Sequence, residues 1–213
     1  MFKNFYKNKY NSGITLVELL VVMSIFMLIT TIAIFNYDKF DSSLSTQNLA
    51  DDIALTIRKA QSYAIGVRGL GNEFNYRYGV HFTANPTSES EYSGSNTSFI
   101  FFVDMNDSYM YEYDNRCGDP SPTYNDCLEI LNITSADLIK EIYRDKTPVS
   151  ESDSTDIFFQ RPNLEPTFYN GAGVKLDGIA SVTIRVSNQD DLTGDKYITV
   201  YNNGQISVSN TFE

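Results

Sequence analysis

An unbroken apolar run, ITLVELLVVMSIFMLITTIAIF, occupies residues 14–35 and contains a single charged residue, Glu18. In a helix that rises 1.5 Å per residue, 22 residues span about 33 Å, which is enough to cross a bilayer. A secretory signal has an apolar stretch of only about 7–15 residues and a small-residue cleavage site after it. Here the run is longer and continues directly into Asn36, so we expect a membrane-spanning helix.

The charges that flank this run are asymmetric. Lys3, Lys7 and Lys9 precede it without any acid, whereas Asp38 and Asp41 follow it. The positive-inside rule therefore predicts a cytoplasmic N-terminus and an exported segment from residue 36 to residue 213.

Glu18 is the anomaly of the run, because a carboxylate near the centre of a membrane costs about 2.5–3.5 kcal/mol. One interpretation is that Glu18 lies shallow and reaches the lipid headgroups. The other is that it has a dedicated cationic partner.

The residues around Glu18, GITLVELLVV from Gly13 onward, resemble the prepilin signature of type IV pilins and pseudopilins. That signature is a short basic leader ending in Gly, an apolar residue, three further residues, Glu and an apolar run. The resemblance implies that prepilin peptidase cleaves between Gly13 and Ile14 and methylates the new amine of Ile14. It also implies that Glu18 pairs with the Ile14 amine of an adjacent subunit, which would supply the cationic partner.

The helical pattern continues through residues 36–66, which contain no proline. An apolar stripe recurs there at helical spacing: Phe40, Leu44, Leu49, Ile53, Ile57, Ala60 and Ala64. A linker helix or a coiled-coil stalk would explain a stripe, but this one is short and rich in Ala, so we expect it to pack against a sheet. Residues 49–65 are also similar to the same helix of the H-type minor pseudopilins (GspH/FimT).

Residues 67–213 have a strand-like pattern and form the expected globular domain. The predicted strands are Tyr76–Phe82, Phe99–Asp104, Leu128–Ile133, Ile157–Gln160, Thr167–Tyr169, Val182–Val186, Tyr197–Tyr201 and Gln205–Val208. Residues 137–144 could form a short helix or a strand, and we favour the helix. We therefore expect an α+β chain with a leader at 1–13, a membrane half-helix at 14–35, an amphipathic half-helix at 36–66 and an antiparallel sheet domain. Its last strands resemble the end of the H-type pseudopilin domain.

Two groups of residues suggest local chemistry in the exported domain. Cys117 and Cys127 lie ten positions apart, and export would permit a disulfide between them, the alternative being two free thiols. A partial calcium-loop pattern places ligand-like residues at Asp104, Asn106, Ser108 and Glu112. It lacks the central Gly and the final Glu of such loops, so a solvated acidic turn is the default interpretation and no cofactor is expected.

Other features argue against catalysis and nucleic-acid binding. The single histidine, His81, has no second His and no Cys–His pairing to support a metal or catalytic site, and no nucleotide or hydrolase motif is present. The alternating Tyr109, Tyr111 and Tyr113 fit an aromatic binding face or one face of a strand equally well. The net charge is −11, and removal of the leader leaves 13 basic and 27 acidic residues.

These observations lead to one main hypothesis and one alternative. The main hypothesis is a structural minor pilin or pseudopilin subunit, not an enzyme, in a type IV pilus or a type II secretion-like pseudopilus. Its expected partners are prepilin peptidase, other subunits, the inner-membrane assembly platform and membrane lipid. Its expected location is the inner membrane and then a periplasmic or extracellular filament. The alternative is an uncleaved single-pass membrane protein whose ectodomain binds a ligand or acts as an enzyme.

Overall fold

The computed structural model describes residues 13–66, 76–87, 90–113, 116–118, 120, 125–163, 165–189 and 194–212. The chain divides into two compact units, Met1–Asp41 and Ser42–Glu213. One α-helix, α1 (Leu16–Ile65), contributes residues to both units. The leader predicted at residues 1–13 lies outside the described residues except for Gly13.

The helical part of the N-terminal unit is apolar and exposed. Leu16–Ile34 form a 19-residue segment with a mean hydropathy of 2.5 and no buried residue, so its length and composition suit a membrane span. Its three hydroxyl side chains are satisfied within the helix. The hydroxyls of Ser24, Thr30 and Thr31 each donate to the carbonyl four residues earlier, at 2.7–2.8 Å. These polar groups therefore need no water in a lipid environment.

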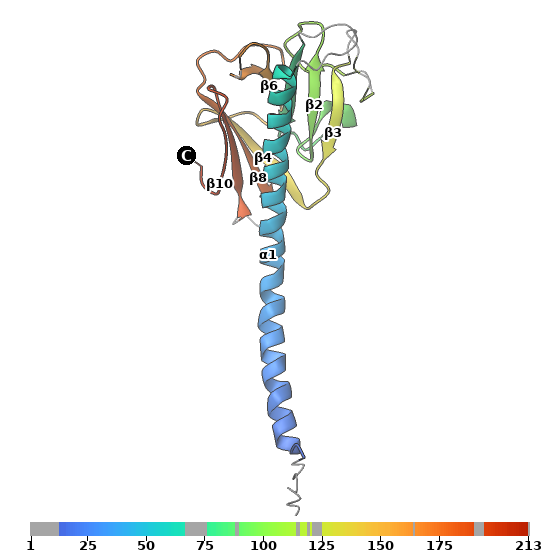
Figure 1. Ribbon diagram of the computed structural model, residues 1–213, viewed down its shortest axis with the longest axis vertical. Coiled ribbons are helices and arrows are strands. Elements are labelled where there is room, and N and C mark those ends of the chain that lie inside the picture. The colour runs from blue at the N-terminus through green and yellow to red at the C-terminus, as the bar shows by residue number, and fades with distance from the viewer. Residues whose placement is uncertain are drawn as a thin grey trace, which may run out of the picture. The chain divides into compact units, whose positions relative to one another are not determined.

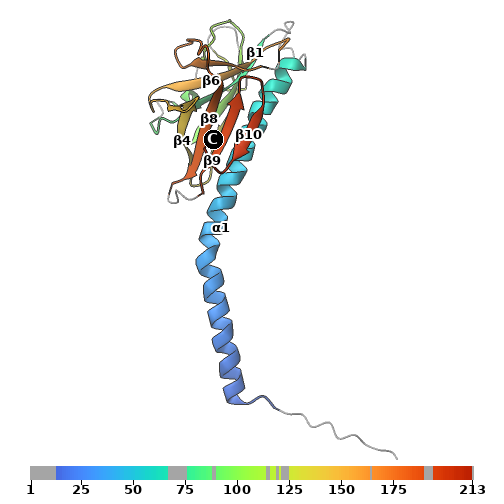
Figure 2. The same ribbon diagram turned by 90° about the vertical axis from the view of Figure 1, so that its left-hand side faces the viewer.

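The C-terminal unit contains two five-stranded antiparallel sheets and the second part of α1 (Figures 1 and 2). Sheet one has the order β3 (Cys127–Asn132), β2 (Ser98–Asp104), β1 (Arg77–Thr83), β6 (Ser154–Phe159) and β7 (Thr167–Asn170). Sheet two has the order β10 (Ile206–Ser209), β9 (Lys196–Tyr201), β8 (Ser181–Asn188), β4 (Asp137–Arg144) and β5 (Thr147–Pro148). A short 3₁₀ helix, η1 (Glu91–Ser93), precedes β2. The α+β class with an N-terminal apolar helix and antiparallel sheets is therefore confirmed.

One hydrophobic core joins both sheets to the second part of α1. Ile53, Ile57 and Ala60 of the helix are fully buried against side chains such as Val80 of sheet one and Ile184 of sheet two. The amphipathic stripe predicted from the sequence thus packs against β-structure, as expected. Its first two members do not take part, because the buried part of the helix begins only at Thr46. Phe40 and Leu44 are 64% and 45% exposed.

The helix predicted at residues 137–144 is wrong, because these residues form strand β4. Pairing between β4 and β8 shifts register between Ile139 and Glu141, which marks a β-bulge at Lys140. The extra residue lets Ile139 and Ile142 both face the core, at 0% and 1% exposure, although they are three positions apart. An odd spacing of apolar residues is typical of a helix, so the bulge explains the error.

Sheet one also has a second, covered face. A smaller cluster packs there, formed by Ile100, Phe102, Tyr111, Cys127, Phe158 and Tyr169. Residues 105–113 contribute Tyr111 to this cover and contain two non-glycine residues with positive φ, Asp107 at 61° and Tyr109 at 60°. The described residues of this stretch form no strand, so the alternating tyrosines do not mark one.

Candidate functional site

The peptide bond between Gly13 and Ile14 lies before the first turn of α1. Both residues are outside regular secondary structure, and Ile14 is 74% exposed. A Cβ built on Gly13 would meet no atom within 4 Å. The fold of the chain therefore leaves this bond accessible to a protease and places no steric requirement for glycine at position 13.

Thr15 caps the helix that follows. Its Oγ1 accepts a hydrogen bond from the backbone N–H of Glu18 at 3.2 Å, and its carbonyl accepts from Leu19 at 3.1 Å. The sequence Thr-Leu-Val-Glu has the spacing of a capping box, a signal that the sequence interpretation missed. Glu18 is thus the third residue of α1, where the positive end of the helix dipole favours a carboxylate.

The carboxylate of Glu18 is exposed in the isolated chain. Across the described ranges, no cationic side chain forms an ion pair with it. The residues of α1 on either side of Glu18 are apolar, so none of them can compensate its charge.

The comparison with known families finds a match over the residues that include Gly13, Ile14 and Glu18. Residues 8–34 match the prokaryotic N-terminal methylation motif. This motif indicates a type IV pilin-like protein that is a substrate of prepilin processing, which implies a prepilin peptidase and pilin assembly. It suggests a membrane-anchored structural subunit rather than an enzyme. No curated protein and no solved structure matches the chain.

Cys117 and Cys127 are joined in a disulfide in this pilin-like chain. Cys127 is fully buried beside Phe102 in the second cluster of sheet one. The N–H of Gly118 donates to the Cys127 carbonyl at 3.1 Å. The disulfide and this backbone hydrogen bond therefore both join the segment around Cys117 to the start of β3.

The four weak calcium candidates lie at the end of β2 and in the loop that follows it. Several of their polar groups already bind one another or neighbouring residues. Asp104 is buried and forms an ion pair with Arg77 at 2.9 Å, and its Oδ1 accepts from the N–H of Ser108. Asn106 donates to Glu112 at 2.6 Å. In the described part of the chain, no three Asp, Glu, His or Cys side chains are grouped to hold a metal ion. The expectation of no cofactor, with this loop as a weak calcium candidate, stays untested.

Asp126 is the most perturbed carboxyl described. Burial, together with the nearby charges of Asp104 and Glu112, raises its pKa to about 8. Its Oδ2 accepts a hydrogen bond from the N–H of Glu112 at 3.0 Å, while its Oδ1 has no partner among the described residues. The carboxyl is therefore mostly protonated at neutral pH.

His81 lies on the same face of sheet one. Its Nδ1 is 2.6 Å from Oδ1 of Asp156 on β6, and both side chains are buried. Oδ2 of Asp156 accepts from the backbone N–H of Tyr111 at 3.4 Å. The His81–Asp156 pair thus connects β1 with β6, and Asp156 also binds the covering loop. This arrangement is that of a residue pair that stabilises the fold.

Proposed function

We propose that this chain is a minor pilin or pseudopilin subunit of a type IV pilus or a type II secretion-like pseudopilus. The observation that carries the proposal is the match to the methylation motif at a place where Gly13 and Ile14 are exposed and non-helical. In this function prepilin peptidase cleaves between the two residues and methylates Ile14. The new amine then lies four residues before Glu18.

Assembly would bury the apolar half of α1 against the same half of other subunits. Leu19, Leu20 and Ile25, for example, are more than half exposed in the single chain, so burial between helices has side chains to cover. The carboxylate of Glu18 would pair with the Ile14 amine of a neighbour, which removes two uncompensated charges from the apolar layer at once.

The finer classification rests on the C-terminal unit. We place the chain with the H-type minor pseudopilins because residues 49–65 and 197–208 resemble theirs. In support, residues 49–65 are the core-facing end of α1, and residues 197–208 lie in the antiparallel pair β9 and β10. Gly204, with φ of 83°, occupies the connecting turn.

This function sets the partners and the location. The chain would enter the inner membrane with its N-terminus in the cytoplasm, meet prepilin peptidase and the assembly platform there, and end in a periplasmic or extracellular filament. The mature chain would carry a net charge of −14, which argues against a nucleic-acid partner.

The test is the mature N-terminus. The chain is co-expressed with a prepilin peptidase and its first residue is read by mass spectrometry, with Gly13→Arg as the variant and Ser12→Ala as the neighbouring control. We expect a methylated Ile14 in the native chain and the control, and an uncleaved chain in Gly13→Arg. A chain that begins at Met1 in all three would instead support the uncleaved membrane protein with a binding or enzymatic ectodomain.

A further inference from the structure

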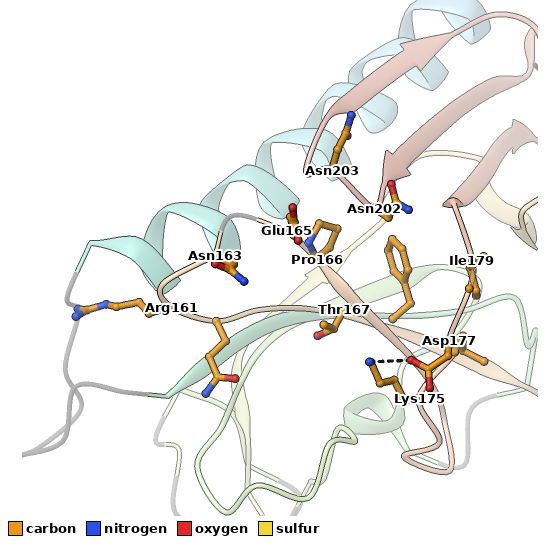
Figure 3. Close-up of a pocket in the computed structure, with 14 residues that line it drawn as sticks. Arg161, Asn163, Glu165, Pro166, Thr167, Lys175, Asp177, Ile179, Asn202 and Asn203 are labelled. Carbon is orange, nitrogen blue, oxygen red and sulfur yellow. Dashed lines mark ion pairs between the residues drawn. The ribbon is translucent and has the colours of Figure 1, made fainter.

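An open pocket in the C-terminal unit has no part in processing or assembly as described above. Its volume is about 450 Å³, which is within the size range of small-molecule sites. Three separate stretches of the chain line it. They contribute residues 160, 161, 163 and 165–168, residues 175–179, and residues 202 and 203 of the β9–β10 turn. Figure 3 shows how these stretches surround one space.

The lining combines an apolar floor with a polar rim. Phe168, 3% exposed, and Pro166 form buried parts of the floor, and Leu176 and Ile179 are half-buried beside them. Asn163, Glu165 and Asn202 stand exposed at the rim (Figure 3). No hydrogen bond within the described residues uses these three side chains, so their donors and acceptors are free for a ligand.

The charges around the pocket are nearly balanced. Lys175 forms an ion pair with Asp177 at 2.7 Å. Arg161 points away from the cavity in Figure 3, and its Nε donates to the carbonyl of Ala64 at the end of α1, over 3.2 Å. Among the described lining residues, Arg161 and Glu165 form no ion pair, so one charge of each sign is left uncompensated. A polycation would find one carboxylate here, and a polyanion would be repelled by a chain of net charge −11.

An exposed aromatic ring outside the lining is connected to it through neighbouring residues. Tyr109 is 37% exposed and stacks on Tyr169, with ring centroids 5.3 Å apart. Two contacts connect this pair to the lining. Gln160 accepts a hydrogen bond from Arg77, whose guanidinium lies 4.0 Å from the Tyr109 ring centroid, and Tyr169 forms a backbone bridge with Lys175.

Tyr109 also holds a costly backbone conformation. Its φ is 60°, which a residue with an aromatic side chain rarely adopts. The contacts with Tyr169 and Arg77 hold the ring in place, and strain of this kind is concentrated at functional sites. A rigid, half-exposed ring beside a polar pocket points to a ligand with an apolar face as well as hydroxyl groups.

We propose that the pocket and Tyr109 together bind a neutral oligosaccharide. The amides of Asn163 and Asn202 and the carboxylate of Glu165 would take the hydroxyl groups of one sugar unit, since an amide can both donate to and accept from a hydroxyl. The apolar floor and the Tyr109 ring would pack against the C–H faces of that unit and the next. This site is independent of the proposed role in assembly.

The experiment uses the full chain in phospholipid nanodiscs, which avoids detergents with sugar headgroups. The probe is a printed panel of short neutral oligosaccharides built from glucose, galactose, mannose and N-acetylglucosamine, with sulfated and uronic-acid oligomers as charged comparisons. The affinity for the best neutral binder is then measured by calorimetry. We expect the Asn163→Ala/Asn202→Ala variant to bind at least about tenfold more weakly, because two hydrogen bonds are lost.

Two further variants make the result specific. Tyr109→Gly removes the ring and relieves the positive φ, so we expect weaker binding without loss of folding, as judged by circular dichroism. Asn132→Ala, at an exposed asparagine on β3 away from the pocket, should bind as the native chain does. Binding of charged oligomers alone, no binding at all, or equal binding by the pocket variants would overturn the proposal. So would a photo-crosslinker at position 202 that captures a second copy of the chain while no glycan binds.

Discussion

Thr46 on α1 donates its hydroxyl hydrogen to Oδ1 of Asp137 at the start of β4, over 2.8 Å, and both residues are buried. Ser45 donates to Oδ2 of the same carboxylate, and Ser135 does so at 2.6 Å. Asn188 at the end of β8 donates to Oδ1 at 3.3 Å. One carboxylate therefore fastens the helix to two strands of sheet two at the point where the helix first becomes buried.

Replacing Asp137 with alanine should destabilise the C-terminal unit strongly. The hydroxyl of Ser135 would lose its acceptor and that of Thr46 would keep only the Ser42 carbonyl, so we expect a loss of about 3 kcal/mol in the free energy of unfolding. Urea unfolding of the full chain in nanodiscs, followed by tyrosine fluorescence, measures this. Asp51→Ala, at an exposed position of the same helix, is the matched control and should change stability by less than about 0.5 kcal/mol. Equal effects of the two variants would contradict the proposed fastening role.

Asp126 should make the native chain less stable as pH rises. Its pKa is raised in the folded state from 3.8 to about 8, so between these values the folded state binds more protons than the unfolded state. Stability contributed by the protonated form is thus full below pH 4 and is lost as pH rises to about 8, at up to about 1.4 kcal/mol per pH unit.

The Asp126→Asn variant isolates this effect, because its amide cannot ionise and can still accept from Glu112. The free energy of unfolding of the variant minus that of the native chain should increase from about pH 5 to about pH 8. Urea midpoints at several pH values supply the difference, and the ionisable groups common to both proteins cancel in it. A difference that is constant with pH would show that Asp126 does not titrate in this range.

Breaking the Cys117–Cys127 disulfide should lower stability by about 2–3 kcal/mol, since it closes a short loop in the unfolded chain. The Cys117→Ser/Cys127→Ala variant keeps a small apolar group at the buried position. Its melting temperature should fall and should no longer respond to reductant, whereas that of the native chain should drop on reduction. An unchanged melting temperature of the native chain in reductant, with both cysteines shown to be free thiols, would count against this contribution.

Glu18→Ala should affect assembly and leave folding unchanged. Glu18 belongs to the N-terminal unit, so we expect urea unfolding of the C-terminal unit to match that of the native chain. Processing at Gly13 should also proceed. Recovery in sheared filaments should fall at least about tenfold, as expected when one charge of a buried pair is left unpaired. Normal recovery would remove the proposed pairing with the Ile14 amine.

Local sequence patterns were sufficient to predict most of the fold. The apolar run and the stripe through Ile53 and Ile57 predicted α1, which ends at Ile65 just before Gly66. Runs of β-branched and aromatic residues predicted eight of the strands to within a few residues. The two-sheet arrangement was beyond such patterns, because strand order depends on pairings between residues far apart in the chain, such as His81 with Asp156.

The candidate sites divide in the same way. Gly13, Ile14 and Glu18 are adjacent in sequence, so a pattern can report them. The Asp137 contacts and the sugar pocket are built from residues far apart, such as Thr46 with Asp137 or Asn163 with Asn202, and only the folded chain brings them together. The β-bulge at Lys140 is intermediate, since it is local but disguises a strand as a helix.

The hydrogen bonds to Asp137 also define a mechanical path. In the proposed filament, tension would reach the C-terminal unit through its own helix, which is continuous from Leu16 to Ile65. Moving along α1 from Ser42, the bonds from Ser45 and Thr46 to Asp137 are the first side-chain bonds to a strand that the structure describes. Under such tension, the hydrogen bonds from Ser45 and Thr46 to Asp137 would be the first of these side-chain bonds to carry load between the helix and sheet two.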